Sequence, residues 1–353
     1  MSTSSSPRVD CTEMVDLSES VYLRTSLIVN LIVTSCALPV LFWATQKLWS
    51  MKYTKLFHAN FKILVQLHLC GFMLHCIGRV ILHSVDLYNY TTKSDPCDMI
   101  PNIYRCFVLR LMYNAGLWIT NSTAVALIIE RWVATKRSVT YERDSLLYGV
   151  LVAVVQLIVA AIPLGLLYWN VSLNDDSPMY YCVAAKATVP FGPQLSAVLS
   201  ITFQLVARLL FHHLHRHNQV RIAAAYDDDT AENESVQRLR TSRLTSTLSN
   251  RYQLEQNISS IACLKTFANM SSVYVLLQNA CFFTLMHFAS SLHHYQYYAT
   301  TELNGSYPTY AILTVLVMSR SVKRVRKQAD ANLKHHLATP NQIYIDNFKK
   351  QIA

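Results

Sequence analysis

Charged residues in this chain gather into short blocks, separated by long stretches without Asp, Glu, Lys or Arg. A helix needs about 20 mostly apolar residues to cross the roughly 30 Å hydrocarbon layer of a membrane. Backbone groups in lipid must be bonded within their own segment, so each stretch is expected to be helical. The uncharged stretches are residues 25–46, 63–78, 111–129, 145–174, 187–207, 266–301 and 303–319.

This pattern predicts an all-α membrane protein, a bundle of seven transmembrane helices. Hydrophobic residues make up 52% of the chain and charged residues 15%, against about 25% charged in soluble domains. Residues 1–20 are expected to form an extracellular N-terminus, 21–326 one seven-helix receptor domain, and 327–353 a cytoplasmic tail. The stretch 266–301 is too long for one crossing, so residues 290–301 are expected to form an external loop. The expected spans are about 22–46, 57–83, 102–131, 145–169, 189–212, 260–289 and 299–319.

The placement of basic residues predicts the orientation. Cytoplasmic loops carry an excess of Lys and Arg. Arg8, Lys93 and Lys186 are nearly alone on one side, which places the N-terminus outside and the C-terminus inside. Residues 1–20 are polar and acidic, so no cleavable signal peptide is expected. Basic residues on the other side include Lys47, Lys52, Lys55, Arg131, Lys136, Arg137, Arg216, Arg221, Arg320, Lys323 and Arg324.

The cysteines divide into two groups. Five of the nine fall within expected spans, where they are small buried hydrophobic residues. The other four are Cys11, Cys97, Cys106 and Cys182, all on the expected external side. That compartment is oxidising, and four cysteines permit three pairings.

The end of the third expected span carries a recognisable motif. Glu130-Arg131-Trp132 resembles the Glu/Asp-Arg-aromatic motif that ends the third helix of G-protein-coupled receptors. Cys106 lies 25 residues before Arg131, the spacing these receptors use for their helix-three disulfide. A helix rises about 37 Å over that length, enough to separate the two membrane faces.

Three segments carry a closer resemblance. Residues 56–62, 130–135 and 248–257 are similar to those of nematode serpentine chemoreceptors of the alpha, alpha/beta and beta classes, with alpha or alpha/beta favoured. The similarity covers residues 21–326. It implies a chemosensory receptor for a small-molecule cue, coupled through Glu130 and Arg131 to a heterotrimeric G protein, in the plasma membrane or sensory cilia of neurons. It also implies a disulfide between Cys106 and Cys182, which by elimination leaves Cys11 and Cys97 as a candidate second pair.

Polar residues in the outer halves of the expected spans are candidates for ligand binding. His75 and Arg79 share a helix face, and ionisable groups inside a membrane are costly enough to suggest a function. The alternative is that Arg79 and Arg110 pair with Asp86 or Glu302 as structural ties. If both arginines are unpaired, an anionic ligand is favoured. The candidates are His75, Arg79, Arg110, Tyr113, Asn114, Trp118, Asn121, Tyr274 and Gln278.

Other functional classes fit the sequence less well. A ligand-gated seven-helix ion channel would place the N-terminus inside, against the charge distribution. A transporter usually needs carboxylates within the membrane, and Glu130 is the single acid expected at a span. No expected helix presents paired carboxylates, a metal triad or a nucleophile with its base, so we expect no enzyme, cofactor or metal site. We also expect no nucleic-acid partner, and the oligomeric state is not indicated.

Two surface features complete the expectations. Asn89 and Asn170 lie in Asn-x-Ser/Thr sites of expected external loops and are candidates for glycosylation, whereas Asn233 is expected to be cytoplasmic. After the last span, an amphipathic stretch carries Arg320, Lys323, Arg324, Arg326 and Lys327. Each positive charge near an anionic inner leaflet contributes about 1 kcal/mol of attraction to its lipids.

Overall fold

The computed structural model describes residues 11–50, 57–137, 146–169, 179–182, 192–230 and 240–352. Within these ranges every regular element is a helix. The elements are α1 (Thr12–Glu19), α2 (Val21–Trp49), α4 (Ala59–Thr92), η1 (Pro96–Met99), α5 (Ile103–Lys136), α6 (Leu146–Tyr168), α7 (Gly192–Thr230), α8 (Arg240–Phe288), η4 (Ala289–Ser291), α9 (His294–Asn304) and α10 (Tyr307–Ile352).

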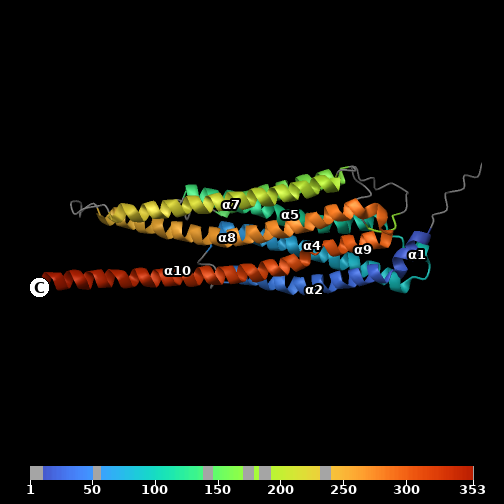
Figure 1. The fold of residues 1–353 in the computed structure, drawn as a ribbon, viewed down its shortest axis with the longest axis horizontal. Coiled ribbons are helices and arrows are strands. Elements are labelled where there is room, and N and C mark those ends of the chain that lie inside the picture. Colours follow the sequence, from blue (N-terminus) through green and yellow to red (C-terminus); the bar gives the residue numbers. More distant parts are fainter. Residues whose placement is uncertain are drawn as a thin grey trace, which may run out of the picture.

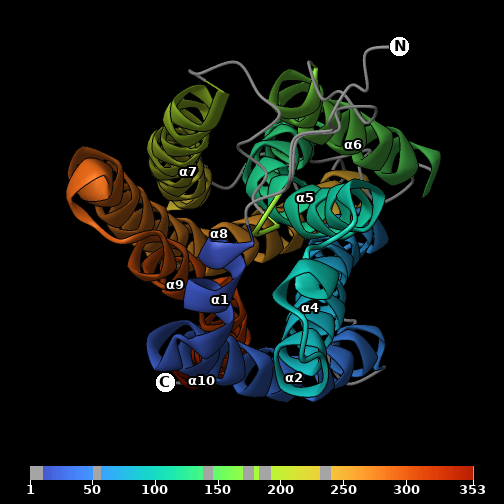
Figure 2. The same ribbon diagram turned by 90° about the vertical axis from the view of Figure 1, so that its right-hand side faces the viewer.

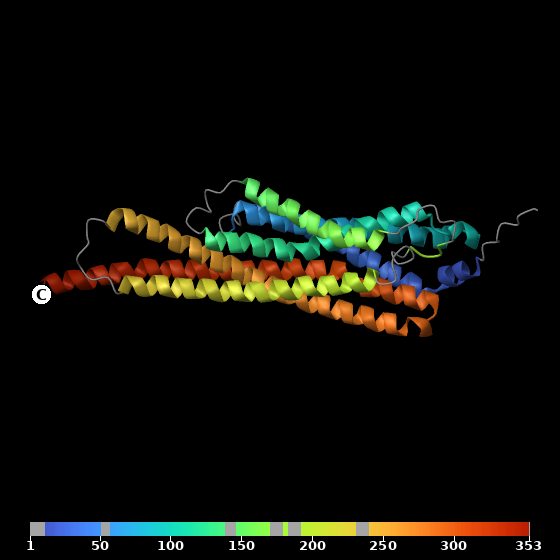
Figure 3. The same ribbon diagram turned by 90° about the horizontal axis from the view of Figure 1, so that it is seen from above.

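The long helices run side by side along one axis and form an elongated bundle (Figure 1). We call one end of it the disulfide end, because Cys11–Cys97 and Cys106–Cys182 are both bonded there. The short helix α1 lies across this end, in front of the surrounding helices (Figure 2). We call the opposite end the Arg131 end; α7, α8 and α10 extend beyond the other helices there (Figure 3).

Several helices are suited to a membrane. Val21–Trp49, Ala59–Thr92, Leu146–Tyr168, Gly192–Val220 and Asn257–Ser291 are long and apolar enough to cross one. On α6, apolar side chains point away from the protein, with Leu147 74% and Ile158 58% exposed, as lipid contact requires. Helices α5 and α10 are more polar, since α5 carries arginines within its length and the apolar part of α10 ends at Arg320. The fold is therefore an all-helical membrane bundle.

The seventh expected span differs from the prediction. Residues 299–319 do not form one helix: α9 ends at Asn304, and α10 begins at Tyr307. Pro308 explains the break, because it has no N–H and its ring would collide with the carbonyl of the residue four positions earlier. The expected external loop at 290–301 is also wrong, since α9 begins at His294 and packs against α2.

Helices α4 and α5 approach each other closely at two glycines. A Cβ on Gly116 would collide with the carbonyl oxygen of Gly71 and lie 2.5 Å from the backbone nitrogen of His75. A Cβ on Gly71 would lie 2.9 Å from Thr120. Only glycine fits such a contact, and this close packing brings the polar side chains of α4 against those of α5.

Candidate functional site

A buried carboxylate organises the disulfide end. Glu302 on α9 is 3% exposed and accepts from the Arg79 Nη2 atom at 2.9 Å and from the Arg110 Nη2 atom at 2.5 Å. The Tyr181 hydroxyl donates to it at 3.0 Å, and His83 Nε2 lies 3.6 Å away. We call these five residues the Glu302 cluster. It joins α4, α5, α9 and the segment before α7.

Arg79 also completes the end of α9. Its Nη2 donates to the Glu302 carbonyl oxygen at 2.8 Å, and its Nη1 donates to the Gly305 carbonyl oxygen. The last carbonyls of a helix have no partner within it, and the negative end of the helix dipole favours a cation. The arginine therefore satisfies carbonyls that the break before Pro308 leaves open.

Arg110 connects the cluster to the disulfide. Its Nε donates to the Cys182 carbonyl oxygen at 2.6 Å, and Cys182 is bonded to Cys106 near the start of α5. Burial raises the pKa of the Tyr181 phenol well above its usual range, and the negative charge of Glu302 adds to the shift. The Tyr181 hydroxyl therefore keeps its proton and remains a donor to Glu302.

The charges of the cluster correct two expectations. Arg79 and Arg110 are both paired with Glu302, as in the alternative in which the two arginines form structural ion pairs. An anionic ligand was favoured only if both arginines were unpaired, and the structure does not meet that condition. Glu130 is also not the single acid at a span, because Glu302 and Asp86 are buried in helices as well. Asp86 pairs with Arg105 at 3.4 Å. Two guanidinium groups around one carboxylate leave the cluster with an excess of one positive charge.

Two further candidate ligand residues adjoin this cluster. His75 Nδ1 lies 3.1 Å from the Tyr113 carbonyl oxygen, and the two rings are 4.2 Å apart. The Tyr113 ring has Arg79 and Arg110 at 5.3 and 5.4 Å from its centroid. The structure thus brings four of the nine candidates together.

The remaining candidates contact other helices. Asn114 donates to the Tyr168 hydroxyl at 2.7 Å, and Asn121 donates to Ser200 at 3.2 Å. Trp118 is buried with its ring edge-on to Phe203, their centroids 6.3 Å apart. On α8, Tyr274 stacks on Tyr310 at 4.2 Å, and Gln278 is half-buried. Their role in ligand binding stays a prediction.

At the opposite end of α5, Arg131 links two helices. It is 3% exposed, and its Nε donates to Glu130 at 2.5 Å while its Nη2 bonds the other oxygen of that carboxylate. Its Nη1 donates to Asn257 of α8 at 3.2 Å, and Asn257 in turn donates to Thr135 at 2.8 Å. The guanidinium also lies 5.3 Å from the centre of the Phe61 ring.

Nearly the whole sequence matches one protein family. Residues 8–228 and 230–353 match the family model described as "Serpentine type 7TM GPCR receptor class ab chemoreceptor". The chain belongs to this family. The sequence motifs favoured the alpha or the alpha/beta class, and class ab is the second of these.

Curated relatives of this class ab chemoreceptor come from Caenorhabditis elegans. Serpentine receptor class beta-17 is 24% identical over 78% of this chain and 72% of its own length. Serpentine receptor class beta-16 is 20% identical over 88% of this chain and 86% of its own. Serpentine receptor class alpha-39 is 23% identical over 51% of this chain and 48% of its own. The protein is therefore a multi-pass membrane protein of a chemoreceptor family, which is a receptor family and not an enzyme family.

Two residues important to the geometry of the chemoreceptor were missing from the candidate list. Glu302 was named only as a partner for the arginines; its position three residues before Gly305 and six before Pro308 was the available indication of a helix end. Asn257 lay within the segment 248–257 that carries the family resemblance, but nothing local linked it to Arg131, which lies 126 positions away.

The structure contains the expected disulfides but does not support one of the expected glycosylation sites. Both expected cysteine pairings are formed in the structure, Cys106–Cys182 and Cys11–Cys97. Asn89 does not lie in an external loop: it is in the last turn of α4 with 7% of its surface exposed, so the folded chain has no room for a glycan there. Asn170 and Asn233 lie outside the described residues.

Proposed function

We propose that this protein is a chemosensory receptor that binds a small-molecule cue at the disulfide end and activates a heterotrimeric G protein at the Arg131 end. In this proposal the N-terminus is outside the cell and the basic face of α10 meets anionic lipids of the inner leaflet. The receptor then acts in the plasma membrane, including the sensory cilia of neurons.

The observation that carries the proposal is the buried link from Arg131 to Asn257. It joins α5 to α8 through one guanidinium, at the end of the bundle where α8 extends beyond α5 (Figure 3). A movement of α8 away from α5 would break this bond and expose a planar group with five donors. Glu130 holds the same guanidinium, so the carboxylate acts as the restraint of the resting arrangement.

At the other end, the Glu302 cluster supports a coupled response to the cue. Its three ion-paired members lie on α4, α5 and α9, so a molecule that competes for either arginine changes how these helices are held together. The guanidinium groups of Arg79 and Arg110 are hydrogen-bond donors, so a cue with a hydrogen-bond-accepting group suits the cluster. The residues that we expect to contact it are those around the cluster, His75 and Tyr113 among them.

The test uses substitutions at the Arg131 end. At equal surface levels, Arg131→Ala should lose G-protein activation, whereas Arg131→Lys should rescue poorly because lysine lacks the planar fork. Glu130→Gln should raise ligand-free activity. Lys136→Ala is the matched control, since Lys136 is an exposed cation on the same helix.

The measurement is the response to a ligand panel in cells, with and without G-protein inhibition, at equal surface levels of an N-terminal epitope tag. Wild-type signalling by Arg131→Ala would show that this arginine does not couple the receptor. A response that persists under G-protein inhibition would favour the ligand-gated channel instead.

A further inference from the structure

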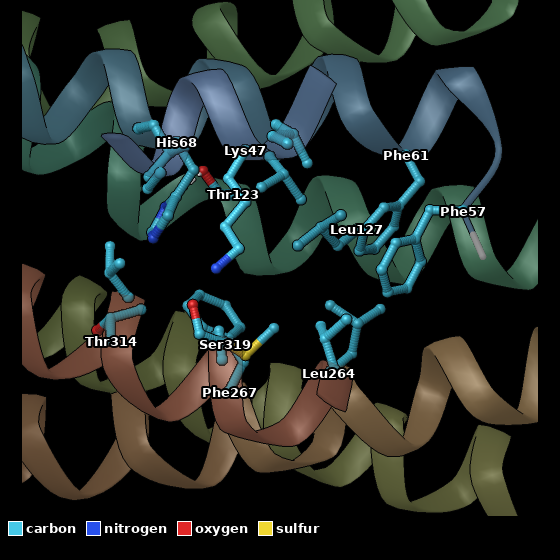
Figure 4. A pocket seen from close by; sticks show the side chains of 17 residues that line it. Lys47, Phe57, Phe61, His68, Thr123, Leu127, Leu264, Phe267, Thr314 and Ser319 are labelled. Atoms are coloured by element: carbon cyan, nitrogen blue, oxygen red, sulfur yellow. Dashed lines mark hydrogen bonds between the residues drawn. The ribbon is translucent and has the colours of Figure 1, made fainter. Parts of the chain in front are cut away.

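A cavity lies near the Arg131 end, away from the Glu302 cluster. It is lined by side chains of α2, α5, α8 and α10, by α4, and by Phe57 just before α4. Figure 4 shows Phe57, Phe61, Leu127, Leu264 and Phe267 around it, which makes most of its wall apolar. No residue of the cluster at the disulfide end takes part, so this is a separate space in the bundle.

The volume of the cavity limits what fits. It measures about 140 Å³. An engineered apolar cavity of about 150 Å³ accepts a benzene-sized molecule and stays dry. A molecule with an apolar body of roughly six carbon atoms matches that volume.

One polar atom in the wall has no partner among the described residues. His68 of α4 is 6% exposed, and its Nε2 makes no hydrogen bond. Figure 4 shows the ring directed into the cavity from above, opposite the side chains of α10. A buried polar atom without a partner is costly, so an occupant that bonds to it gains affinity by removing that cost.

The hydrogen bonds of Thr123 determine which role this nitrogen has. The Thr123 hydroxyl donates its single proton to the Ile119 carbonyl oxygen at 2.9 Å and accepts from Gln156 at 2.7 Å. His68 Nδ1, 3.2 Å from the same hydroxyl oxygen, is therefore the donor of that pair. In the neutral ring this leaves Nε2 with a lone pair, an acceptor facing the cavity.

We infer that this cavity is a second ligand site, for a small apolar molecule with one hydroxyl group, such as a phenol or a six-carbon alcohol. The hydroxyl donates to His68 Nε2, and the apolar body lies among Phe61, Leu264 and Phe267.

The site lies next to Arg131, so an occupant should affect G-protein coupling; this step rests on the proposed function. Phe61 lines the cavity, and its ring lies beneath the Arg131 guanidinium. An occupant braces Phe61 and so favours the arrangement in which Arg131 bonds to Glu130 and Asn257. Binding itself does not depend on coupling, so it is tested directly.

The experiment measures binding of 4-fluorophenol by ¹⁹F NMR to the full-length receptor in phosphatidylcholine nanodiscs, with empty nanodiscs as the background. 4-Fluorotoluene, which lacks the hydroxyl, should bind about tenfold more weakly. His68→Phe keeps an aromatic ring at this position and should weaken 4-fluorophenol about tenfold while leaving 4-fluorotoluene unchanged. Hexan-1-ol should displace both probes.

Two further variants separate this site from others. Val65→Phe fills the cavity and should abolish specific binding of both probes, whereas His287→Phe, at an exposed histidine of α8, should change neither. The proposal is wrong if the two probes bind wild-type receptor equally, if His68→Phe weakens both alike, or if binding does not exceed that of empty nanodiscs.

Discussion

At the scale of single residues, the disulfide end depends on one acid. Glu302 is buried and holds two arginines that are themselves buried. Removing one partner of a buried ion pair costs far more than the pair contributes, because it leaves a charge without compensation. Glu302 is therefore the residue of the cluster whose loss should be most severe.

Glu302→Gln tests this reading with almost no change in shape. We expect the free energy of unfolding to fall by about 3–5 kcal/mol, because Arg79 and Arg110 both lose their counter-charge. Asp86→Asn is the control and should cost less, since its partner Arg105 is 28% exposed and is partly hydrated. The thermal midpoints of the purified variants are the measurement. Equal losses in the two variants would contradict the central place of Glu302.

At the scale of elements, the break between α9 and α10 positions the cluster. Gly305 lies in the break with φ −69°, so its backbone conformation is open to any residue. What restricts it is space: a Cβ would lie 2.8 Å from Arg79 Nη2 and 3.0 Å from the Tyr113 hydroxyl. The break and the two arginine-bearing helices are therefore fitted to each other.

Gly305→Ala should lower the thermal midpoint, because the methyl group pushes Arg79 away from the end of α9. Gly165→Ala is the matched control: nothing lies within 4 Å of its Cβ position on α6, and alanine is the better helix former there by about 1 kcal/mol. The control should be neutral or stabilising. If both variants had the same midpoint as the wild type, the close contact between Gly305 and Arg79 would not contribute to stability.

At the scale of the whole molecule, the two disulfides support one orientation. Both lie at the same end of the bundle, and disulfides persist in an oxidising compartment. The distribution of Lys and Arg independently predicts that the other end faces the cytoplasm. We therefore expect the disulfide end to face outside.

Glycosylation gives a direct test of that orientation. Asn170→Gln should remove a glycosidase-sensitive mass shift, because the loop after α6 is expected outside. Asn233→Gln should leave the shift unchanged, and so should Asn89→Gln, since Asn89 is buried in α4. Immunoblots of glycosidase-treated membranes provide the measurement. A shift that disappears only with Asn233→Gln would invert the proposed topology.

Much of the architecture could be predicted from the sequence. Uncharged stretches predicted the all-helical fold, and the segments around Arg131 predicted the chemoreceptor family. Where the prediction was wrong, neighbouring elements decided the outcome. Residues 290–301 read as a polar loop, but α9 forms there with Ala299 buried and Ser26 of α2 donating to its carbonyl oxygen at 3.0 Å.

The sequence by itself determined that the fold is an all-helical membrane bundle, because the cost of placing a charge or an unpaired backbone group in lipid depends only on local composition. Only the tertiary structure decided which polar groups meet. Glu302 lies 223 positions from Arg79 and 192 from Arg110, and no local pattern ranks it above Asp86 as their partner. Likewise, the open acceptor on His68 results from hydrogen bonds to Thr123, a residue of another helix. Such pairings arise from packing between helices. That packing sets the distances between side chains on different helices, and the order of residues along one helix does not.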